Sequence, residues 1–307
     1  MPCYQCRTVQ VHRAHGRVFA PLSMERCHVS GADHSPAPES GGLAYAARLT
    51  REHSVIRTER RGSVVIVTID NPPVNALPVA GWFAFADALR EAGRDPATHA
   101  VIVAAEGRGF QAGVDIKELA ADPTHRSLVE VNRGCAETFA AVYDCPVPVV
   151  AAVNGFCLGG GIGIAGNADI LVASDDATFG VPEVDRGALG TATHLARLVP
   201  QHKVRAMFFT GEMVTAADLL AFGTCERVVP RSELLATALE IANAIAAKSS
   251  LVIRRAKESL NGIEAVDVKR AYRYEQGFTF EVNLWGDSDE LRQAFVDKRD
   301  ADLGKDS

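Results

Sequence analysis

Residues 147–163 read VPVVAAVNGFCLGGGIG, an uninterrupted apolar run followed by three consecutive glycines. The β-branched run predicts a buried strand, and the apolar spacing after the glycines predicts a helix. The first backbone N–H groups of a helix have no intrahelical partner, and glycine lets a ligand oxygen approach them closely. The stretch therefore predicts a strand, a turn that binds an anion or a carbonyl oxygen, and a helix.

The same alternation of apolar strands and helical patterns runs through the middle of the chain. Strands are predicted at residues 63–70, 99–107, 147–155 and 169–180, and helices at residues 79–93 and 127–144. Near-continuous apolar strands that alternate with helices indicate an α/β fold with a parallel sheet covered on both faces. After about residue 190 helices dominate; they are predicted at residues 232–249 and 251–263, and a capping box at Thr215 and Asp218.

The composition is that of an ordinary globular protein, with 47% hydrophobic and 23% charged residues among 307 and a net charge of −6. The acidic balance argues against a nucleic-acid partner, and no apolar run reaches the roughly 18 residues of a membrane span. Cys135, Cys145 and Cys157 lie in apolar or helical contexts, which predicts buried thiols rather than a disulfide framework. A start without a secretory signal then favours the cytoplasm.

Residues 1–52 mix Cys, His, Arg, Ser, Pro and Gly without a regular period, and we expect a disordered N-terminal extension. Met24 offers an internal start. The alternative is a zinc site, but the spacing of its candidate ligands matches no established pattern. These candidates are Cys3, Cys6, His12, His15, Cys27 and His28. We therefore expect no metal.

A second stretch, GRGFQAGVDIKEL (residues 107–119), also places small residues in a turn between a strand and a helix. Two such turns after neighbouring strands can supply one N–H each to a single oxygen, as in an oxyanion hole. Phosphate binding is the alternative, but the patterns GxGxxG and GxxxxGK[ST] are both absent. Close helix–strand packing explains one glycine and less readily three in succession.

The chain resembles the crotonase (enoyl-CoA hydratase/isomerase) superfamily through several motifs in the family's order. These are NPPVNAL, GRGFQAGVDIKEL, VPVVAAVNGFCLGGGIG, NADILVASDDATFGVPEVDRGALG and AFVDKR, between about residues 54 and 300. The resemblance implies a spiral of ββα repeats, the ClpP-like fold, over residues 53–190. It also implies a helical region over residues 191–307 that assembles homotrimers, often paired as homohexamers.

The resemblance also implies where an acyl-CoA substrate binds. The backbone N–H groups of Ala112 and Gly160 would form the oxyanion hole around the thioester carbonyl. Asp115 is expected to fix its own turn or helix cap, and Lys117 to meet CoA phosphates. The residues expected to contact the substrate or its CoA are Gly113, Asp115, Lys117, Gly159, Phe295 and Lys298.

Hydratases of the family use two glutamates, and this chain keeps only one of the two positions. Gly163 stands at the first position and Glu183 at the second, within FGVPEVDRG. Paired carboxylates position a water and deliver a proton, so Gly163 argues against ordinary hydration. Thr191 stands where dienoyl isomerases and a dehalogenase carry an aspartate.

Glu183 is the predicted base, because the resemblance places it over the thioester, where a partly desolvated setting raises the pKa of a carboxyl towards working pH. Asp185, two residues away, is a second candidate participant. His194 is expected to be a packed helix histidine, Asp169 a structural acid before a strand, and Lys257 a surface charge.

One carboxylate and one oxyanion hole suit hydrolytic C–C cleavage beside a thioester. Glu183 would activate water to attack a ring ketone, and the hole would stabilise the resulting enolate. A closer resemblance, to crotonase-fold hydrolases of steroid catabolism, implies a bicyclic thioester from cholesterol C/D-ring breakdown. It includes THLARLVPQH (residues 193–202) and YRYEQGFTFEVNL (residues 272–284).

The sequence thus predicts an acyl-CoA ring-opening hydrolase that needs no cofactor, since coenzyme A is part of the substrate. Two alternatives remain open. One is an enoyl-CoA hydratase or isomerase, and the other is a non-catalytic crotonase-like protein that binds RNA or acts as a scaffold.

Overall fold

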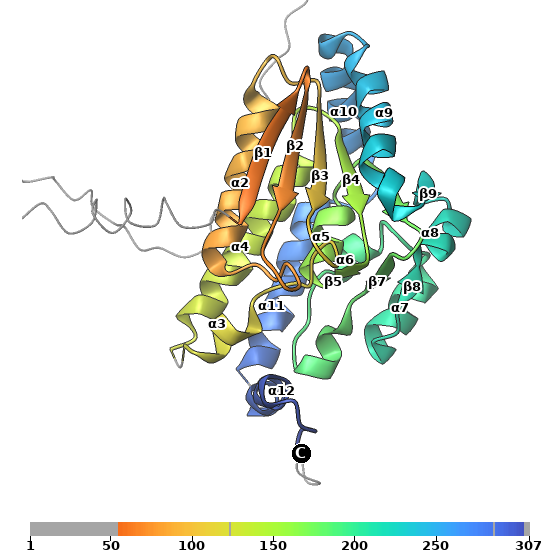
Figure 1. The fold of residues 1–307 in the computed structure, drawn as a ribbon. Coiled ribbons are helices and arrows are strands. Elements are labelled where there is room, and N and C mark those ends of the chain that lie inside the picture. The colour runs from red at the N-terminus through yellow and green to blue at the C-terminus, as the bar shows by residue number, and fades with distance from the viewer. Residues whose placement is uncertain (1–54, 123, 285, 304–307) are drawn as a thin grey trace, which may run out of the picture. The chain divides into compact units, whose positions relative to one another are not determined.

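The computed structural model describes residues 55–122, 124–284 and 286–303 (Figure 1). The strands are β1 (Ile56–Arg61), β2 (Val64–Ile69), β3 (Ala100–Ala105), β4 (Val149–Val153), β5 (Phe156–Leu158), β6 (Ile170–Ser174), β7 (Thr178–Gly180), β8 (Val214–Thr215) and β9 (Arg227–Val229). The α-helices are α2 (Val79–Arg94), α3 (Ile116–Ala120), α4 (Arg126–Tyr143), α5 (Gly160–Ala165), α6 (Ala192–Leu195), α7 (Gln201–Thr210), α8 (Ala216–Phe222), α9 (Leu234–Ala246), α10 (Ser250–Ile263), α11 (Val268–Asn283) and α12 (Gly286–Asp297). Short 3₁₀ helices are η1 (Pro182–Arg186) and η2 (Arg231–Glu233).

The main sheet has the strand order β1-β2-β3-β4-β6-β9, in which β1 is antiparallel to β2 and the other neighbours are parallel. Its strands alternate with α2, α4 and α5 along the chain, as the sequence pattern predicts. A smaller sheet, β5-β7-β8, joins the segment after β3 through a parallel bridge between Gln111 and Cys157. The carboxyl ends of β2, β3 and β4 point towards the lower part of Figure 1, where α3, α11 and α12 lie.

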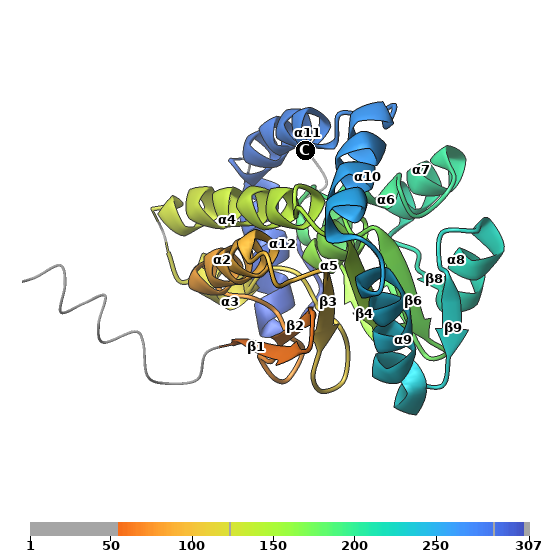
Figure 2. The same ribbon diagram turned by 90° about the horizontal axis from the view of Figure 1, so that it is seen from above.

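Helices cover both faces of the main sheet (Figure 2). On β2, Val65 and Val67 join the core beneath α2 and α4, whereas Val64 and Ile66 join the core beneath α9. This two-sided burial explains why the strands are apolar at nearly every position rather than at every second one. The predicted doubly covered parallel sheet is confirmed.

Three features of the two sheets were not expected from the sequence. Strand β1 reads IRTERR and is buried only at Ile56, so its edge position leaves no apolar alternation. Residues 169–180 form two strands, β6 and β7, which belong to different sheets. Strand β9 pairs with β6, although it lies after residue 190, where the helical C-terminal region was predicted to begin. The main sheet therefore includes a strand from that region.

Lys257 corrects another expectation, because its side chain is buried rather than exposed. Its Nζ lies 2.6 Å from Asp169 Oδ2 and 3.3 Å from the carbonyl oxygen of Val147. Asp169 also accepts from the N–H of Val149 at 2.7 Å, which confirms it as a structural acid at the start of a strand. The long alkyl stem lets a lysine on α10 reach a carboxylate at the sheet.

Other local predictions are confirmed. Thr215 and Asp218 form the capping box of α8, and Cys135, Cys145 and Cys157 are buried free thiols. The predicted disordered extension and the alternative zinc site in residues 1–52 lie outside the described residues.

Candidate active site

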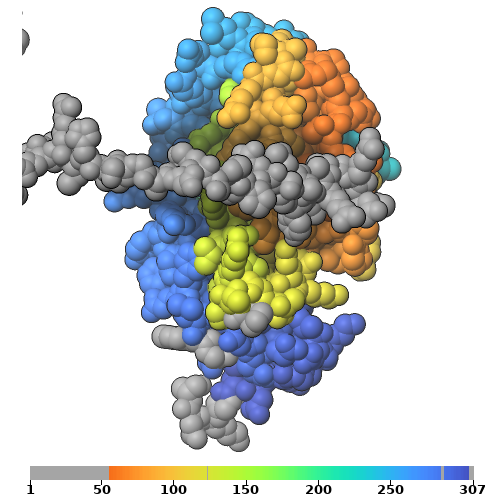
Figure 3. All heavy atoms as spheres, turned by 90° about the vertical axis from the view of Figure 1, so that its left-hand side faces the viewer, coloured from red at the N-terminus to blue at the C-terminus, as the bar shows by residue number. Residues whose placement is uncertain are grey.

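A cavity of about 300 Å³ lies at the carboxyl end of the main sheet. Its walls come from the turn before α3, from α4, from the start of α5, from η1 and the segment after it, and from α11 and α12. Helix α12 (dark blue) packs beneath α3 (yellow) at this end of the molecule, as Figure 3 shows. Most of the surface that lines the cavity is apolar, so charges inside it are only weakly screened.

Both predicted oxyanion-hole residues, Ala112 and Gly160, line this cavity. Neither backbone N–H donates a hydrogen bond within the described part of the chain. The two turns touch, since a Cβ built on Gly113 would lie 3.6 Å from the nitrogen of Gly160. This geometry leaves two adjacent donors for one ligand oxygen.

Gln111 holds the first of these turns, which the sequence reasoning missed. Its buried Oε1 accepts from the N–H of Gly113 at 2.7 Å, and its Nε2 donates to the carbonyl of Gly113 at 2.6 Å. These two hydrogen bonds form a closed ring between the Gln111 side chain and the backbone of Gly113, which fixes the peptide groups between the two residues. Gln111 therefore presets the orientation of the Ala112 peptide.

Glu183 projects from η1 into the same cavity and lies against the first turn of α5. A Cβ on Gly159, whose φ is +53°, would lie 2.3 Å from Glu183 Oε1, so only glycine leaves this carboxyl in place. Glu183 Oε2 is buried and has no hydrogen-bond partner among the described residues. Burial raises the pKa of Glu183 to about 8, although Arg186 opposes the shift.

Asp185, the second predicted participant, does not join Glu183. Its side chain is exposed, and its carboxylate lies against Gly211 at the end of α7, where a Cβ would approach Oδ2 to 2.7 Å. It is not part of the cavity lining. The structure thus brings Glu183 to Ala112 and Gly160 and leaves Asp185 outside.

Gly163, at the first glutamate position, has no room for any side chain. A Cβ there would lie 2.2 Å from Cζ of Phe139. The Phe139 ring is held by edge contacts with Trp82, His194 and Tyr272 at centroid distances of 5.8, 4.8 and 5.1 Å. The space beside residue 163 is therefore filled by an aromatic ring, and no second carboxylate faces Glu183 from α5.

Thr191 does line the cavity and is buried, with a φ of +65°. Its hydroxyl donates to the carbonyl oxygen of Gly190 at 2.7 Å. The position at which other family members carry an aspartate therefore supplies no charge here.

The residues predicted to bind CoA are dispersed. Asp115 caps α3 and accepts from the N–H of Lys117 at 3.0 Å, as the turn-fixing prediction has it. Lys117 and Lys298 are exposed and lie outside the cavity lining, whereas Phe295 on α12 lines the cavity. Their contacts with CoA stay predictions.

Buried polar groups on α11 and α12 were missed by the sequence reasoning. Arg292 lines the cavity at 9% exposure and donates to the side-chain oxygens of Asn283 and Asp289. The sequence did contain a signal for Arg292: an arginine on the apolar face of a helix is rarely buried unless it has a partner.

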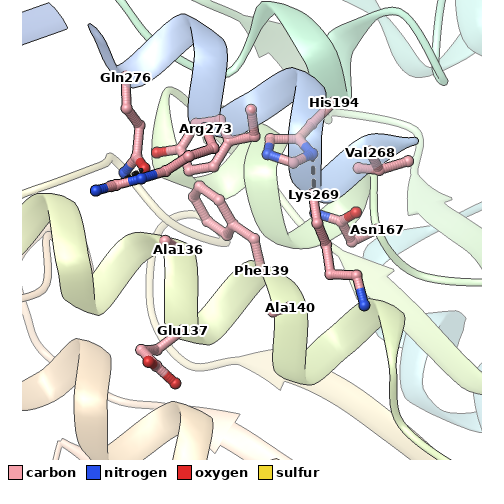
Figure 4. Close-up of a pocket in the computed structure, with 11 residues that line it drawn as sticks. Ala136, Glu137, Phe139, Ala140, Asn167, His194, Val268, Lys269, Arg273 and Gln276 are labelled. Carbon is pink, nitrogen blue, oxygen red and sulfur yellow. Dashed lines mark hydrogen bonds between the residues drawn. The ribbon is translucent and has the colours of Figure 1, made fainter. Parts of the chain in front are cut away.

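A second cavity, of about 290 Å³, lies between α4, α6 and α11 (Figure 4). Phe139 and Tyr272 line both cavities and so separate them. His194 Nδ1 lies 2.9 Å from Asn167 Nδ2, an amide that only donates, so the network assigns the imidazole proton to Nε2. Burial lowers the pKa of His194 to about 3, so the imidazole is neutral, and its burial on α6 confirms the predicted packed helix histidine.

The described residues include no group of three or more His, Cys, Asp or Glu side chains arranged to hold a metal ion. Within the same residues, no single helix has the length and apolarity to cross a membrane. One bent helix pair, Arg231–Ala246 with Ser250–Ile263, meets those criteria by length and composition alone.

Curated relatives match most of the chain. The protein named (7aS)-7a-methyl-1,5-dioxo-2,3,5,6,7,7a-hexahydro-1H-indene-carboxyl-CoA hydrolase from Rhodococcus jostii is 64% identical over 234 residues, 76% of this chain and 91% of that protein. Its namesake from Mycobacterium tuberculosis is 57% identical over 244 residues, 80% of this chain and 99% of that protein.

Solved structures agree with this likeness. Carnitinyl-CoA hydratase from Mycobacterium avium superposes with a TM-score of 0.72 at 30% identity, covering 83% of this chain and all of that one (100%). An enoyl-CoA hydratase/isomerase from Xanthobacter autotrophicus gives a TM-score of 0.74 at 29% identity, with coverage of 80% and 94%. Residues 59–306 match the enoyl-CoA hydratase/isomerase family, and the chain therefore belongs to this family and has the crotonase fold.

Proposed function

We propose that this protein is an acyl-CoA hydrolase that opens a ring of a bicyclic, steroid-derived CoA thioester by hydrolytic C–C cleavage. The two relatives named as indene-carboxyl-CoA hydrolases support the substrate class, since they are 64% and 57% identical to this chain. The observation that carries the proposal is the carboxyl of Glu183, whose buried Oε2 has no partner among the described residues, in a cavity where Phe139 fills the space of a second carboxylate.

In the proposed reaction, the ionised carboxylate of Glu183 takes a proton from a water molecule. The water oxygen bonds to the carbon of the ring ketone, and the carbonyl electron pair moves to the ketone oxygen. When that pair returns, the C–C bond to the ring junction breaks and its electrons pass through the conjugated system to the thioester. The N–H groups of Ala112 and Gly160 stabilise the resulting enolate, a charge absent from the bound substrate. Glu183 then returns its proton to the enolate carbon.

The balance of this reaction is one water consumed and one carboxylic acid formed. It requires no cofactor besides the coenzyme A of the substrate. We further propose a homotrimer or homohexamer in the cytoplasm, as the family resemblance implies.

Mass spectrometry of products from two thioesters tests the function. The protein is incubated with the bicyclic 1,5-dioxo-indene-carboxyl-CoA and, separately, with crotonyl-CoA, and the products are fragmented because both reactions add one water. A new carboxylic acid from the bicyclic thioester, with crotonyl-CoA unchanged, is the expected result. A 3-hydroxyacyl product from crotonyl-CoA would instead identify a hydratase, and turnover of neither would favour a binding protein.

A further inference from the structure

Two arginines, Arg186 on η1 and Arg292 on α12, line the same cavity as Glu183. The guanidinium carbon of Arg186 lies 4.5 Å from the centre of the Phe295 ring, and its Nη1 donates to the carbonyl oxygen of Pro182 at 2.9 Å. Among the described residues Arg186 forms no ion pair with any carboxylate. A partly buried cation without a carboxylate partner is costly, and such a group is expected where a ligand supplies the charge.

The helical geometry of η1 directs Arg186 into the cavity that Glu183 lines. In a 3₁₀ helix the side chains at positions i and i+3 eclipse each other. Glu183 and Arg186 are related in this way, so both enter the cavity, whereas Asp185 points to solvent. The Coulombic influence of Arg186 on the pKa of Glu183 agrees with this proximity.

Helix α12 brings Arg292 into the lining of the same cavity. Arg292 and Phe295 are three residues apart on α12, and side chains at that spacing share one helix face. Ser288 fixes the docking of α12 on η1, since its hydroxyl donates to the carbonyl oxygen of Gly187. Phe295 therefore shares a face of α12 with Arg292 and stacks on the guanidinium of Arg186.

The proposed hydrolysis requires more than one anion site. Hydration of an enoyl thioester develops charge at the thioester oxygen alone. Hydrolytic ring opening also develops charge at the ketone oxygen, first in the tetrahedral adduct and then in the product carboxylate. The Ala112 and Gly160 N–H groups serve the thioester oxygen, which leaves the ketone oxygen without a partner at that position.

We propose that Arg186 forms a second oxyanion site, in a cavity wall that Arg292 helps to hold, and that this site binds the ring-ketone oxygen of the substrate and the carboxylate that hydrolysis makes from it. This inference rests on the proposed function and assigns the second charge of that reaction. Arg186 makes the direct contact, because it eclipses Glu183 on η1 and has no competing carboxylate. Arg292 donates to Asn283 and is paired with Asp289, so it helps to hold the wall of the cavity and leaves the free charge to Arg186.

Steady-state kinetics and product inhibition of three variants test this site. Arg186→Met keeps the packing on Phe295 but removes the charge, and Arg186→Lys keeps a charge without the planar fork. Arg205→Met is the matched control, because Arg205 is an exposed arginine stacked on Phe209 at 5.2 Å outside the cavity. For ring opening, Arg186→Met is expected to lower kcat about 10²–10³-fold, Arg186→Lys less, and Arg205→Met not at all.

Inhibition by the chemically prepared ring-opened thioester separates charge recognition from a structural effect. The wild type should bind the ring-opened acid more tightly than its primary amide, and Arg186→Met should lose this preference while its affinity for the amide stays.

The outcomes distinguish this inference from the proposed function. If the wild type leaves the bicyclic thioester closed, the proposed function fails, and this inference fails with it. If the wild type opens the ring but Arg186→Met retains its kcat and its preference for the acid, only the second oxyanion site is overturned.

Discussion

Glu183 and Lys257 are both ionisable side chains in the interior, and the fold treats them in opposite ways. Lys257 Nζ reaches Asp169 and two backbone carbonyl oxygens, at 2.6, 3.3 and 3.5 Å. Glu183 has a buried carboxyl oxygen with no partner and a pKa raised to about 8. A buried charge with full pairing serves the fold, whereas one left unpaired destabilises the fold and stays available for chemistry.

Glu183→Gln is expected to have the largest effect on activity. The amide keeps the shape of the carboxyl but cannot accept a proton, so ring opening should fall at least about 10³-fold, with little change in thioester binding. The same variant should be more stable than the wild type at neutral pH, by about 1–3 kcal/mol, because it removes an unpaired buried acid. Activity assays and urea unfolding at pH 8 measure both effects, and equal activity of variant and wild type would remove Glu183 from the mechanism.

Lys257→Met tests the other side of the comparison. It leaves Asp169, whose side chain is 24% exposed, without its cation, and losing these charge-assisted hydrogen bonds costs about 1–3 kcal/mol of unfolding free energy. The control is Lys269→Met, since Lys269 and Asp144 pair at the surface with side-chain exposures of 53% and 49%. The control should cost less than about 1 kcal/mol. Chemical denaturation measures the free energy of unfolding of both variants. Equal losses would show that the buried position of Lys257 does not make its ion pair more stabilising than the surface pair.

The pH dependence of stability and of kcat/KM in the wild type and in Glu183→Gln tests the raised pKa of Glu183 directly. The folded pKa of Glu183, about 8, lies above its ordinary value of 4.5, so ionising this group destabilises the fold. Its contribution to stability is complete below pH 4.5 and is lost as pH rises through about 8, so the stability advantage of Glu183→Gln should grow over that range. The kcat/KM of the wild type should rise about tenfold per pH unit up to pH 8 and then level off. A flat profile between pH 6 and 8 would contradict a base with this pKa.

The sheet and the two small-residue turns follow from local sequence patterns, whereas Glu183 was predicted from the family resemblance. Apolar β-branched runs such as residues 64–69 predict buried strands because the period of a strand and its two-sided burial are properties of the segment itself. The turns at Ala112 and Gly160 are visible because small residues after a strand are a local signal. Strand β1 is not visible in this way, since an exposed edge strand keeps no apolar alternation.

Local sequence patterns do not show which residues pair with the buried polar and charged side chains. Lys257 lies in RRAKESL, which has the charge density of a solvated helix face, and its partner Asp169 is 88 residues away in the chain. Arg292 and Gln111 are similar cases, because their roles depend on how α12 docks and on the backbone of one turn. Tertiary packing decides such pairings, and it can override the reading of a single segment.

Asp185→Asn is expected to have the smallest effect and gives the most direct contrast with Glu183. The two carboxylates are two residues apart on η1, but Asp185 is exposed and faces Gly211 outside the cavity. A solvated carboxylate there touches no substrate, so kcat and kcat/KM for ring opening should change less than about twofold. Steady-state kinetics of Asp185→Asn and Glu183→Gln, measured in parallel, give both parameters, and the unfolding midpoint of each variant checks that it is folded. A loss of about tenfold or more in kcat alone would return Asp185 to the mechanism, because the 3₁₀ geometry of η1 would then not be what separates the two acids.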